Sequence, residues 1–176
     1  MRIEIDDLSR PAVHALLREH LDDMHAISPP ESVHALDLAK LRSPDISFWT
    51  VWDGEVLLGC GALKQLDARH GEVKAMRTPQ ALRRRGAGWA VLSHIIAEAG
   101  ARGYERLSLE TGSMIEFQPA HRLYASHGFR FCGPFGSYRA DPNSVFMSLS
   151  LAGAAAASAA SAASAKIDAD PLASIG

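Results

Sequence analysis

Residues 83–88 read Arg-Arg-Arg-Gly-Ala-Gly and stand where the hydrophobic pattern of the chain changes. Upstream, residues 46–77 are rich in β-branched and aromatic residues and contain the turn signal Asp53-Gly54, so they predict a meander of three strands. Downstream, the apolar residues between positions 89 and 99 recur at helical spacing. Residues 83–88 are therefore predicted to open a helix that follows a strand.

This predicted helix start has the properties of an anion-binding site. Gly86 and Gly88 let the backbone approach a ligand closely, and the unpaired N–H groups in the first turn of a helix point outward. The helix dipole favours an anion there, and a pyrophosphate group fits such a site. The arginines, with Lys74 and Arg77 nearby in the sequence, add positive charge. A glycine-rich helix start beside solvated arginines explains the same residues equally well.

The remaining segments complete a mixed α/β pattern. Apolar spacing and turn signals predict further strands at residues 1–5, 107–110, 129–132 and 145–151, and further helices at about 11–24, 33–41 and 119–127. A meander followed by a β-α-β unit favours one mixed, mostly antiparallel twisted sheet of about seven strands, with helices on both faces. We therefore expect an α/β fold (α+β) over residues 1–151.

Composition restricts the classes of function. Lys plus Arg is 18 and Asp plus Glu is 20 in 176 residues, and the net charge of −2 argues against a general nucleic-acid binder. No apolar run approaches the ~18 residues that a membrane-spanning helix needs. Cys60 and Cys132 are predicted to be buried, inert thiols, which suit a reducing cytoplasm. We expect a cytoplasmic protein that binds no metal, nucleic acid or membrane.

The last 25 residues differ from the rest of the chain. Residues 152–176 contain 12 Ala and 4 Ser and no aromatic residue. Alanine favours helix, but the Ala-Ser repeats supply no large apolar stripe with which to dock. The composition predicts a disordered or marginally helical extension rather than a docked element.

A second motif identifies the family that the chain resembles. Residues 123–129 read Leu-Tyr-Ala-Ser-His-Gly-Phe, which fits L-Y-x-x-x-G-F, while residues 83–88 fit (Q/R)-x-x-G-x-(G/A). Together with the order of elements, the two motifs resemble the GNAT superfamily of N-acetyltransferases over residues 1–151. Residues 134–146 are similar to a bacterial subgroup of that superfamily.

The resemblance implies acetyl-CoA as a co-substrate. Backbone N–H groups near residues 84–88 would hold its pyrophosphate, and the strand that ends at residues 76–78 would pair with the pantetheine arm. That arm would lie in a V-shaped opening against the strand at 107–110. The cofactor-binding residues implied are Met76, Arg77, Thr78, Arg83, Arg84, Arg85, Gly86, Ala87, Gly88 and Tyr124.

Acetyl transfer to an amine needs a base and an acid. A lysine-like amine is only about one part in 10³ neutral at pH 7, which costs about 4 kcal/mol, and a base offsets part of this cost. The resemblance suggests Glu72 as the base and Tyr124 as the acid that meets the departing sulfur. The alternatives are a solvent-facing glutamate at the end of a hairpin and a core aromatic on an amphipathic helix.

Four residues are candidates for the acceptor site. His25 and His34 flank a Ser-Pro-Pro-Glu break in the region that forms the acceptor lip in the superfamily, and Phe135 and Tyr138 precede the last predicted strand. The alternatives are solvated histidines at helix ends and aromatic residues of a turn-rich loop. We expect direct transfer, in a ternary complex, to a primary amine of a small molecule, amino acid or peptide. A non-catalytic acyl-CoA-binding module is the alternative, and a homodimer is compatible with either.

Overall fold

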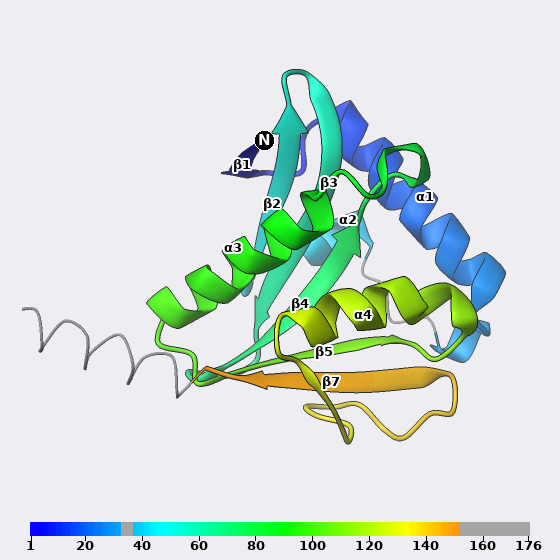
Figure 1. Ribbon diagram of the computed structural model, residues 1–176, viewed down its shortest axis with the longest axis vertical. Helices are drawn as coiled ribbons and strands as arrows, with labels where there is room; N and C mark the ends of the chain where they lie inside the picture. The colour runs from blue at the N-terminus through cyan, green and yellow to red at the C-terminus, as the bar shows by residue number, and fades with distance from the viewer. Residues whose placement is uncertain (33–36, 152–176) are drawn as a thin grey trace, which may run out of the picture.

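The computed structural model describes residues 1–32 and 37–151, and within them seven strands form one sheet (Figure 1). The strands are β1 (Arg2–Ile5), β2 (Ile46–Asp53), β3 (Val56–Gln65), β4 (His70–Arg77), β5 (Arg106–Gly112), β6 (Arg130–Cys132) and β7 (Ser144–Ser150), and the helices are α1 (Pro11–Ile27), α2 (Leu38–Leu41), α3 (Ala87–Ala101) and α4 (Gln118–Ser126). His34 and the Ala/Ser-rich segment 152–176 lie outside the described residues.

The sheet is mixed, as the sequence predicts. Its strand order is β1-β2-β3-β4-β5-β7-β6, and every neighbouring pair is antiparallel except β4 and β5. The parallel pair is joined through α3, which is the β-α-β unit expected from the change in hydrophobic pattern. The predicted fold class is confirmed.

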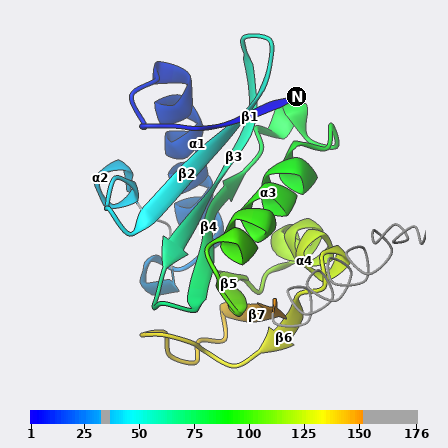
Figure 2. The same cartoon turned by 90° about the vertical axis from the view of Figure 1, so that its left-hand side faces the viewer.

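Two hydrophobic cores lie on opposite faces of the sheet. Figure 2 shows α1 on one side of the strands and α3 with α4 on the other. Trp49 belongs to the core under α3 and α4, whereas Trp52 belongs to the core under α1. Leu92 and Ile95 of α3 are fully buried, and burial of each side chain contributes about 2–3 kcal/mol to folding.

Two glycines of β3 allow α3 to pack closely on the sheet. A Cβ atom on Gly61 would lie 2.9 Å from Ile95 Cδ1 and 2.7 Å from Met76 Sδ. A Cβ atom on Gly59 would lie 2.8 Å from the carbonyl oxygen of Arg77. A larger residue at either position would push α3 or β4 away from β3.

Strands β4 and β5 separate soon after they meet. Their pairing comprises His70 with Arg106, Gly71 with Leu107 and Glu72 with Ser108, and Figure 1 shows the two strands diverging beyond it. The rest of β4 also carries a bulge. Two steps along β3, from partner Cys60 to partner Ala62, correspond to three steps along β4, and Ala75 has φ +51°. Such bulges redirect the side chains that follow them.

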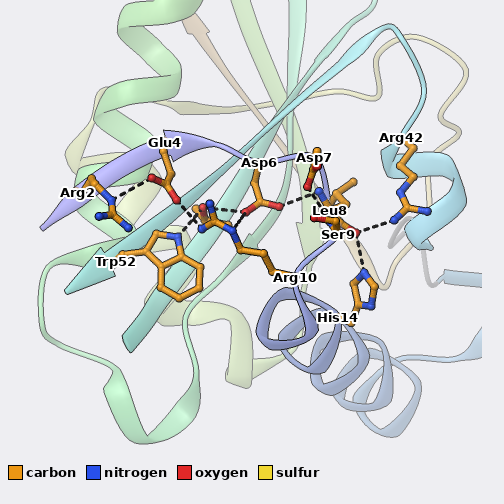
Figure 3. A network of polar contacts seen from close by, with 11 residues as sticks. Arg2, Glu4, Asp6, Asp7, Leu8, Ser9, Arg10, His14, Arg42 and Trp52 are labelled. Atoms are coloured by element: carbon orange, nitrogen blue, oxygen red, sulfur yellow. Dashed lines mark hydrogen bonds and ion pairs between the residues drawn. The ribbon is translucent and has the colours of Figure 1, made fainter. Parts of the chain in front are cut away.

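A polar network fastens β1 to the start of α1 (Figure 3). The Arg10 guanidinium donates to Glu4 at 2.5 Å, contacts Asp6 at 3.5 Å and lies 5.0 Å from the centre of the Trp52 ring. The carbonyl oxygen of Leu8 contacts Nε2 of His14 and Nη2 of Arg42. The connection between β1 and α1 is therefore held by Arg10, which contacts the acidic residues before it, and by Arg42, which donates to its backbone.

Several local expectations are corrected. Helix α3 begins at Ala87, so residues 83–86 form a loop in front of the helix rather than its first turn. Cys132 is exposed, because β6 is an edge strand, whereas Cys60 is buried and burial raises the pKa of its thiol to about 12.

No helix in the part of the chain that the structure describes is long and apolar enough to span a bilayer.

Candidate functional site

The N-terminus of α3 offers unpaired backbone donors. Gly86 is the N-cap residue with φ +84°, and no side chain caps the helix. The first backbone bond of the helix runs from Ala90 N to Gly86 O, so the N–H groups before Ala90 have no partner within the helix. Arg84 also has a positive φ, of 64°, and the side chains of Arg83, Arg84 and Arg85 are exposed. Outward N–H groups and three cations are thus combined in one loop.

This helix start lies beside the end of β4 and beside α4. A Cβ atom on Gly88 would lie 3.4 Å from Leu123 Cδ2 and 3.8 Å from Thr78 Oγ1. Gly88, Thr78 and the helix that carries Tyr124 are therefore neighbours in space. The structure brings together three of the segments from which the sequence predicted a cofactor site.

Two cations expected to strengthen this site point elsewhere. The Arg77 guanidinium donates to Glu19 at 2.6 Å and to Asp23, both on α1. The Lys74 ammonium donates to Glu72 at 2.9 Å. The positive charge of Arg77 and Lys74 is therefore neutralised locally, and the expectation that it adds to the arginine loop is wrong. Only the backbone of Arg77 remains in position for the predicted role.

Tyr124 is both a core residue and a site candidate. Its ring is buried and meets Phe129 edge-to-face at 5.9 Å. Burial and the charge of Glu110 raise the pKa of Tyr124, so the phenol stays protonated throughout the ordinary pH range. Tyr124 also follows Leu123, the residue closest to Gly88 across the two helices. Packing thus fixes a protonated hydroxyl on the helix that borders the α3 N-terminus.

Glu72 is buried, which is incompatible with a solvent-facing glutamate at a hairpin end. Strand β4 begins two residues earlier, at His70, and the Glu72 side chain is 3% exposed. Its Oε1 atom accepts hydrogen bonds from Lys74 Nζ and, at 2.6 Å, from the Tyr138 hydroxyl. Glu72 also pairs with Ser108, the last paired position before β4 and β5 diverge. The carboxylate lies where the two strands separate.

Phe135 and Tyr138 line a pocket at this carboxylate. The pocket has a volume of about 220 Å³ and is lined by Lys64, Leu66, Glu72, Lys74, Phe135, Gly136, Ser137 and Tyr138. The Phe135 and Tyr138 rings lie 5.1 Å apart, and each packs against Phe146 of β7. Burial and the neighbouring carboxylate of Glu72 raise the pKa of Tyr138, which keeps its hydroxyl a donor.

His25 does not line this pocket, because it is exposed in the last turn of α1. His34 is outside the described residues. A second pocket of about 570 Å³ is lined by Glu31, Ser32, Ser137, Tyr138, Arg139, Ala140, Asp141, Pro142 and Asn143. Ser137 and Tyr138 line both pockets, so both pockets border the β6–β7 connection.

Sequence reasoning missed Lys74 as a partner of Glu72 and missed Glu110 altogether. Glu110 lies on β5, accepts a hydrogen bond from Ser144 at 2.7 Å, and its charge raises the pKa of both Tyr124 and Tyr138. The available signal was a carboxylate two positions beyond Ser108, on the same face of a mostly apolar strand. The negative charge of Glu110 therefore acts on both tyrosines and favours the protonated form of each hydroxyl.

Comparisons with known proteins agree with this geometry. The model of the acetyltransferase (GNAT) family matches residues 13–129. The uncharacterized N-acetyltransferase YsnE of Bacillus subtilis is 59% identical over 151 residues, which cover 86% of this chain and 100% of that protein. The uncharacterized N-acetyltransferase YedL of Escherichia coli is 53% identical over 149 residues, 85% of this chain and 94% of that protein.

Solved structures share the fold. A protein from Klebsiella pneumoniae assigned as an acyl-CoA N-acyltransferase is 27% identical with a TM-score of 0.71, over 85% of this chain and 97% of that chain. An aminoglycoside 6'-N-acetyltransferase complexed with coenzyme A is 14% identical with a TM-score of 0.63, over 86% and 97% of the two chains. With its diverging central strands, its uncapped helix start and these matches, the chain belongs to the GNAT family of acetyltransferases.

Proposed function

We propose that the protein transfers an acetyl group from acetyl-CoA to a primary amine of a small molecule, amino acid or peptide, by direct attack in a ternary complex. One observation carries the proposal. Strands β4 and β5 part after Glu72, and the free part of β4 leads to Thr78 beside the N-terminus of α3. A buried carboxylate therefore lies where the strands part, and the free part of β4 leads to a helix start whose first N–H groups have no partner within the helix.

The residues present fit a CoA thioester. The N–H groups near residues 84–88, with Arg83, Arg84 and Arg85, would hold the pyrophosphate, because outward N–H groups and cations both favour phosphate oxygens. Beyond Glu72 the main chain of β4 has no partner in β5, so residues 76–78 are available to pair with the pantetheine arm. The thioester supplies an acyl group that an amine can attack.

Glu72 would accept the proton that the acceptor amine must lose. A protonated amine with a lysine-like pKa needs about 4 kcal/mol to become neutral at pH 7, and an adjacent carboxylate offsets part of this cost. Burial of Glu72 strengthens its interaction with an ammonium group, because the local dielectric is low. The pocket shared by Glu72, Phe135 and Tyr138 is where we place the acceptor amine.

Tyr124 would assist the departing sulfur. Its raised pKa lies further above that of a thiol, for which ~8.5 is ordinary, so complete proton transfer to sulfur is uphill. A hydrogen bond to the sulfur as its negative charge develops remains favourable, and such donors in buried sites typically contribute 10²–10³-fold to rate. We therefore assign Tyr124 as a hydrogen-bond donor to the leaving group. The exposed free thiol of Cys132 suits a reducing compartment, and we place the protein in the cytoplasm.

Binding and turnover test the proposal separately. Acetyl-CoA should raise the melting temperature, and a thiol-release assay over a panel of primary amines should find an acceptor. Tyr124→Phe should lower kcat about 10²-fold or more. Glu72→Gln should lower kcat and remove the acidic limb of the pH–rate profile. Tyr104→Phe is the matched control, because Tyr104 is a buried tyrosine of the α3–β5 connection.

Each outcome has a distinct meaning. Acetyl-CoA binding without turnover of any amine would favour a non-catalytic acyl-CoA-binding module. No stabilisation by acetyl-CoA would contradict both functions. Full turnover by Tyr124→Phe would remove that residue from the mechanism, and an unchanged profile for Glu72→Gln would assign proton removal to another group.

A further inference from the structure

The carboxylate of Glu72 is held by two donors from different parts of the chain. Lys74 Nζ lies 2.9 Å from Glu72 Oε1, and the Tyr138 hydroxyl lies 2.6 Å from the same oxygen. Lys74 Nζ also donates to the Tyr138 hydroxyl at 2.8 Å, which closes a triangle of hydrogen bonds. Because both donors use Oε1, neither of them occupies Oε2.

Tyr138 reaches Glu72 from the connection between β6 and β7. Its ring packs against Phe135 and Phe146, and Lys74 Nζ lies 5.5 Å from the centre of the same ring. The phenol is therefore fixed by aromatic contacts on the loop side and by a cation on the strand side. Tyr138 therefore belongs to a loop by sequence, but its half-buried ring is held by contacts with two other elements, β4 and β7.

We propose that Tyr138 and Lys74 are positioning residues that fix Glu72 through Oε1 and so present Oε2 to the acceptor amine. This inference rests on the proposed function, in which Glu72 is the base. It adds that the β6–β7 connection supplies a residue, Tyr138, that orients the base, although Tyr138 lies 66 residues further along the chain than Glu72. A carboxylate with one immobilised oxygen loses less freedom when the reacting groups align, which favours the productive geometry.

Polar groups from several elements surround Glu72. They comprise Lys74 and His70 on the same face of β4, Lys64 opposite on β3, Arg106 and Glu110 on β5, and Tyr138 from the loop. Two of them, Lys74 and Tyr138, donate hydrogen bonds to the Glu72 carboxylate. Removing either donor should therefore lower kcat, because Oε1 of Glu72 is then held by one donor fewer.

A double-mutant cycle tests whether Tyr138 acts through Glu72. Tyr138→Phe alone should lower kcat about 10-fold or more, the effect of a lost hydrogen bond to a charged group, with little change in the KM for acetyl-CoA. In the Glu72→Gln background the same change should have almost no further effect, because the carboxylate that it positions is absent. Lys74→Met should show the same pattern in the two backgrounds. Lys74→Arg should have a higher kcat than Lys74→Met, because it keeps a positively charged donor at this position. Tyr104→Phe is again the control.

The outcomes separate this inference from the proposed function. If the native protein turns over no amine, the proposed function fails and the positioning role fails with it. If the native protein is active but Tyr138→Phe lowers kcat by the same factor in the native protein and in the Glu72→Gln variant, the positioning role alone is wrong. A rise in the KM for the amine with unchanged kcat would also overturn it, since Tyr138 would then bind the acceptor.

Discussion

Removing the acidic partners of Arg77 should destabilise the protein more than removing Arg77 itself. The Arg77 side chain is only 7% exposed, whereas its partners Glu19 and Asp23 on α1 are 44% and 41% exposed. The Nε atom of Arg77 is buried without a hydrogen-bond partner among the described residues. The guanidinium therefore depends on the two carboxylates, but each carboxylate can return to water.

The expected magnitudes follow from what each variant leaves behind. Glu19→Ala with Asp23→Ala leaves a buried, uncompensated guanidinium, which should cost about 3–5 kcal/mol. Arg77→Met keeps the apolar stem and leaves two half-exposed carboxylates one turn apart, whose mutual repulsion costs a few tenths of a kcal/mol. Its total cost should be about 1 kcal/mol, since replacing a buried charge by an apolar side chain of similar volume is often nearly neutral. The two variants should differ by about 2 kcal/mol or more.

Urea unfolding followed by far-UV circular dichroism at pH 7.5 measures these differences. The triple variant should recover most of the stability lost by the double acidic variant, because the buried charge is gone. Arg69→Met, which breaks the exposed Arg69–Glu105 pair, is the control and should change stability by about 0.5 kcal/mol or less. The dependence of Arg77 on its two carboxylates is contradicted if Arg77→Met costs as much stability as the double variant, or if the triple variant recovers none of the lost stability.

Two further predictions concern pH and packing. Burial and the nearby Arg77 lower the pKa of His20 from 6.5 to about 4, so below pH 6.5 the unfolded chain binds a proton that the folded chain refuses. Stability should therefore fall by up to about 3 kcal/mol as pH drops from 6.5 to 4, and His20→Gln should remove that part of the loss in urea unfolding. A Cβ atom on Gly112 would lie 2.2 Å from Phe117 Cε2, so Gly112→Ala should cost about 1–3 kcal/mol in thermal unfolding. Gly100→Ala, in α3 with open space around it, should instead stabilise by about 0.5–1 kcal/mol. An equal effect of the two alanines would contradict the packing argument.

Local sequence signals were sufficient for the elements and for one side of the site. Strand alternation, the Asp53-Gly54 turn and helical spacing predicted the element order, because each depends on residues close together in the chain. The arginine and glycine motif indicated the α3 N-terminus for the same reason. Only the predicted start of the helix was wrong, since the helix begins at Ala87, and Arg84 and Gly86 adopt positive φ in the loop before it.

The other side of the site depends on contacts between distant segments. Tyr138 meets Glu72 across 66 residues, and no periodicity within either segment records that meeting. The Asp-Pro-Asn-Ser sequence near Tyr138 predicts turns and says nothing about where the loop packs. Glu110 was likewise missed because its role comes from its distance to two tyrosines on separate elements.

The wrong expectation for Arg77 has a specific structural cause. Strict alternation along β4 would place Arg77 on the same face as Val73, which belongs to the core under α3, and so on the side of the arginine loop. The extra residue at the β4 bulge reverses that order, since Met76 packs against the α3 core and Ala75 against the α1 core. Arg77 therefore faces α1 and its acidic residues. Nothing at Ala75 signals the bulge, because alanine rarely adopts the φ of +51° found there. One unpredicted residue thus converts a cation expected at the cofactor site into the tether between β4 and α1.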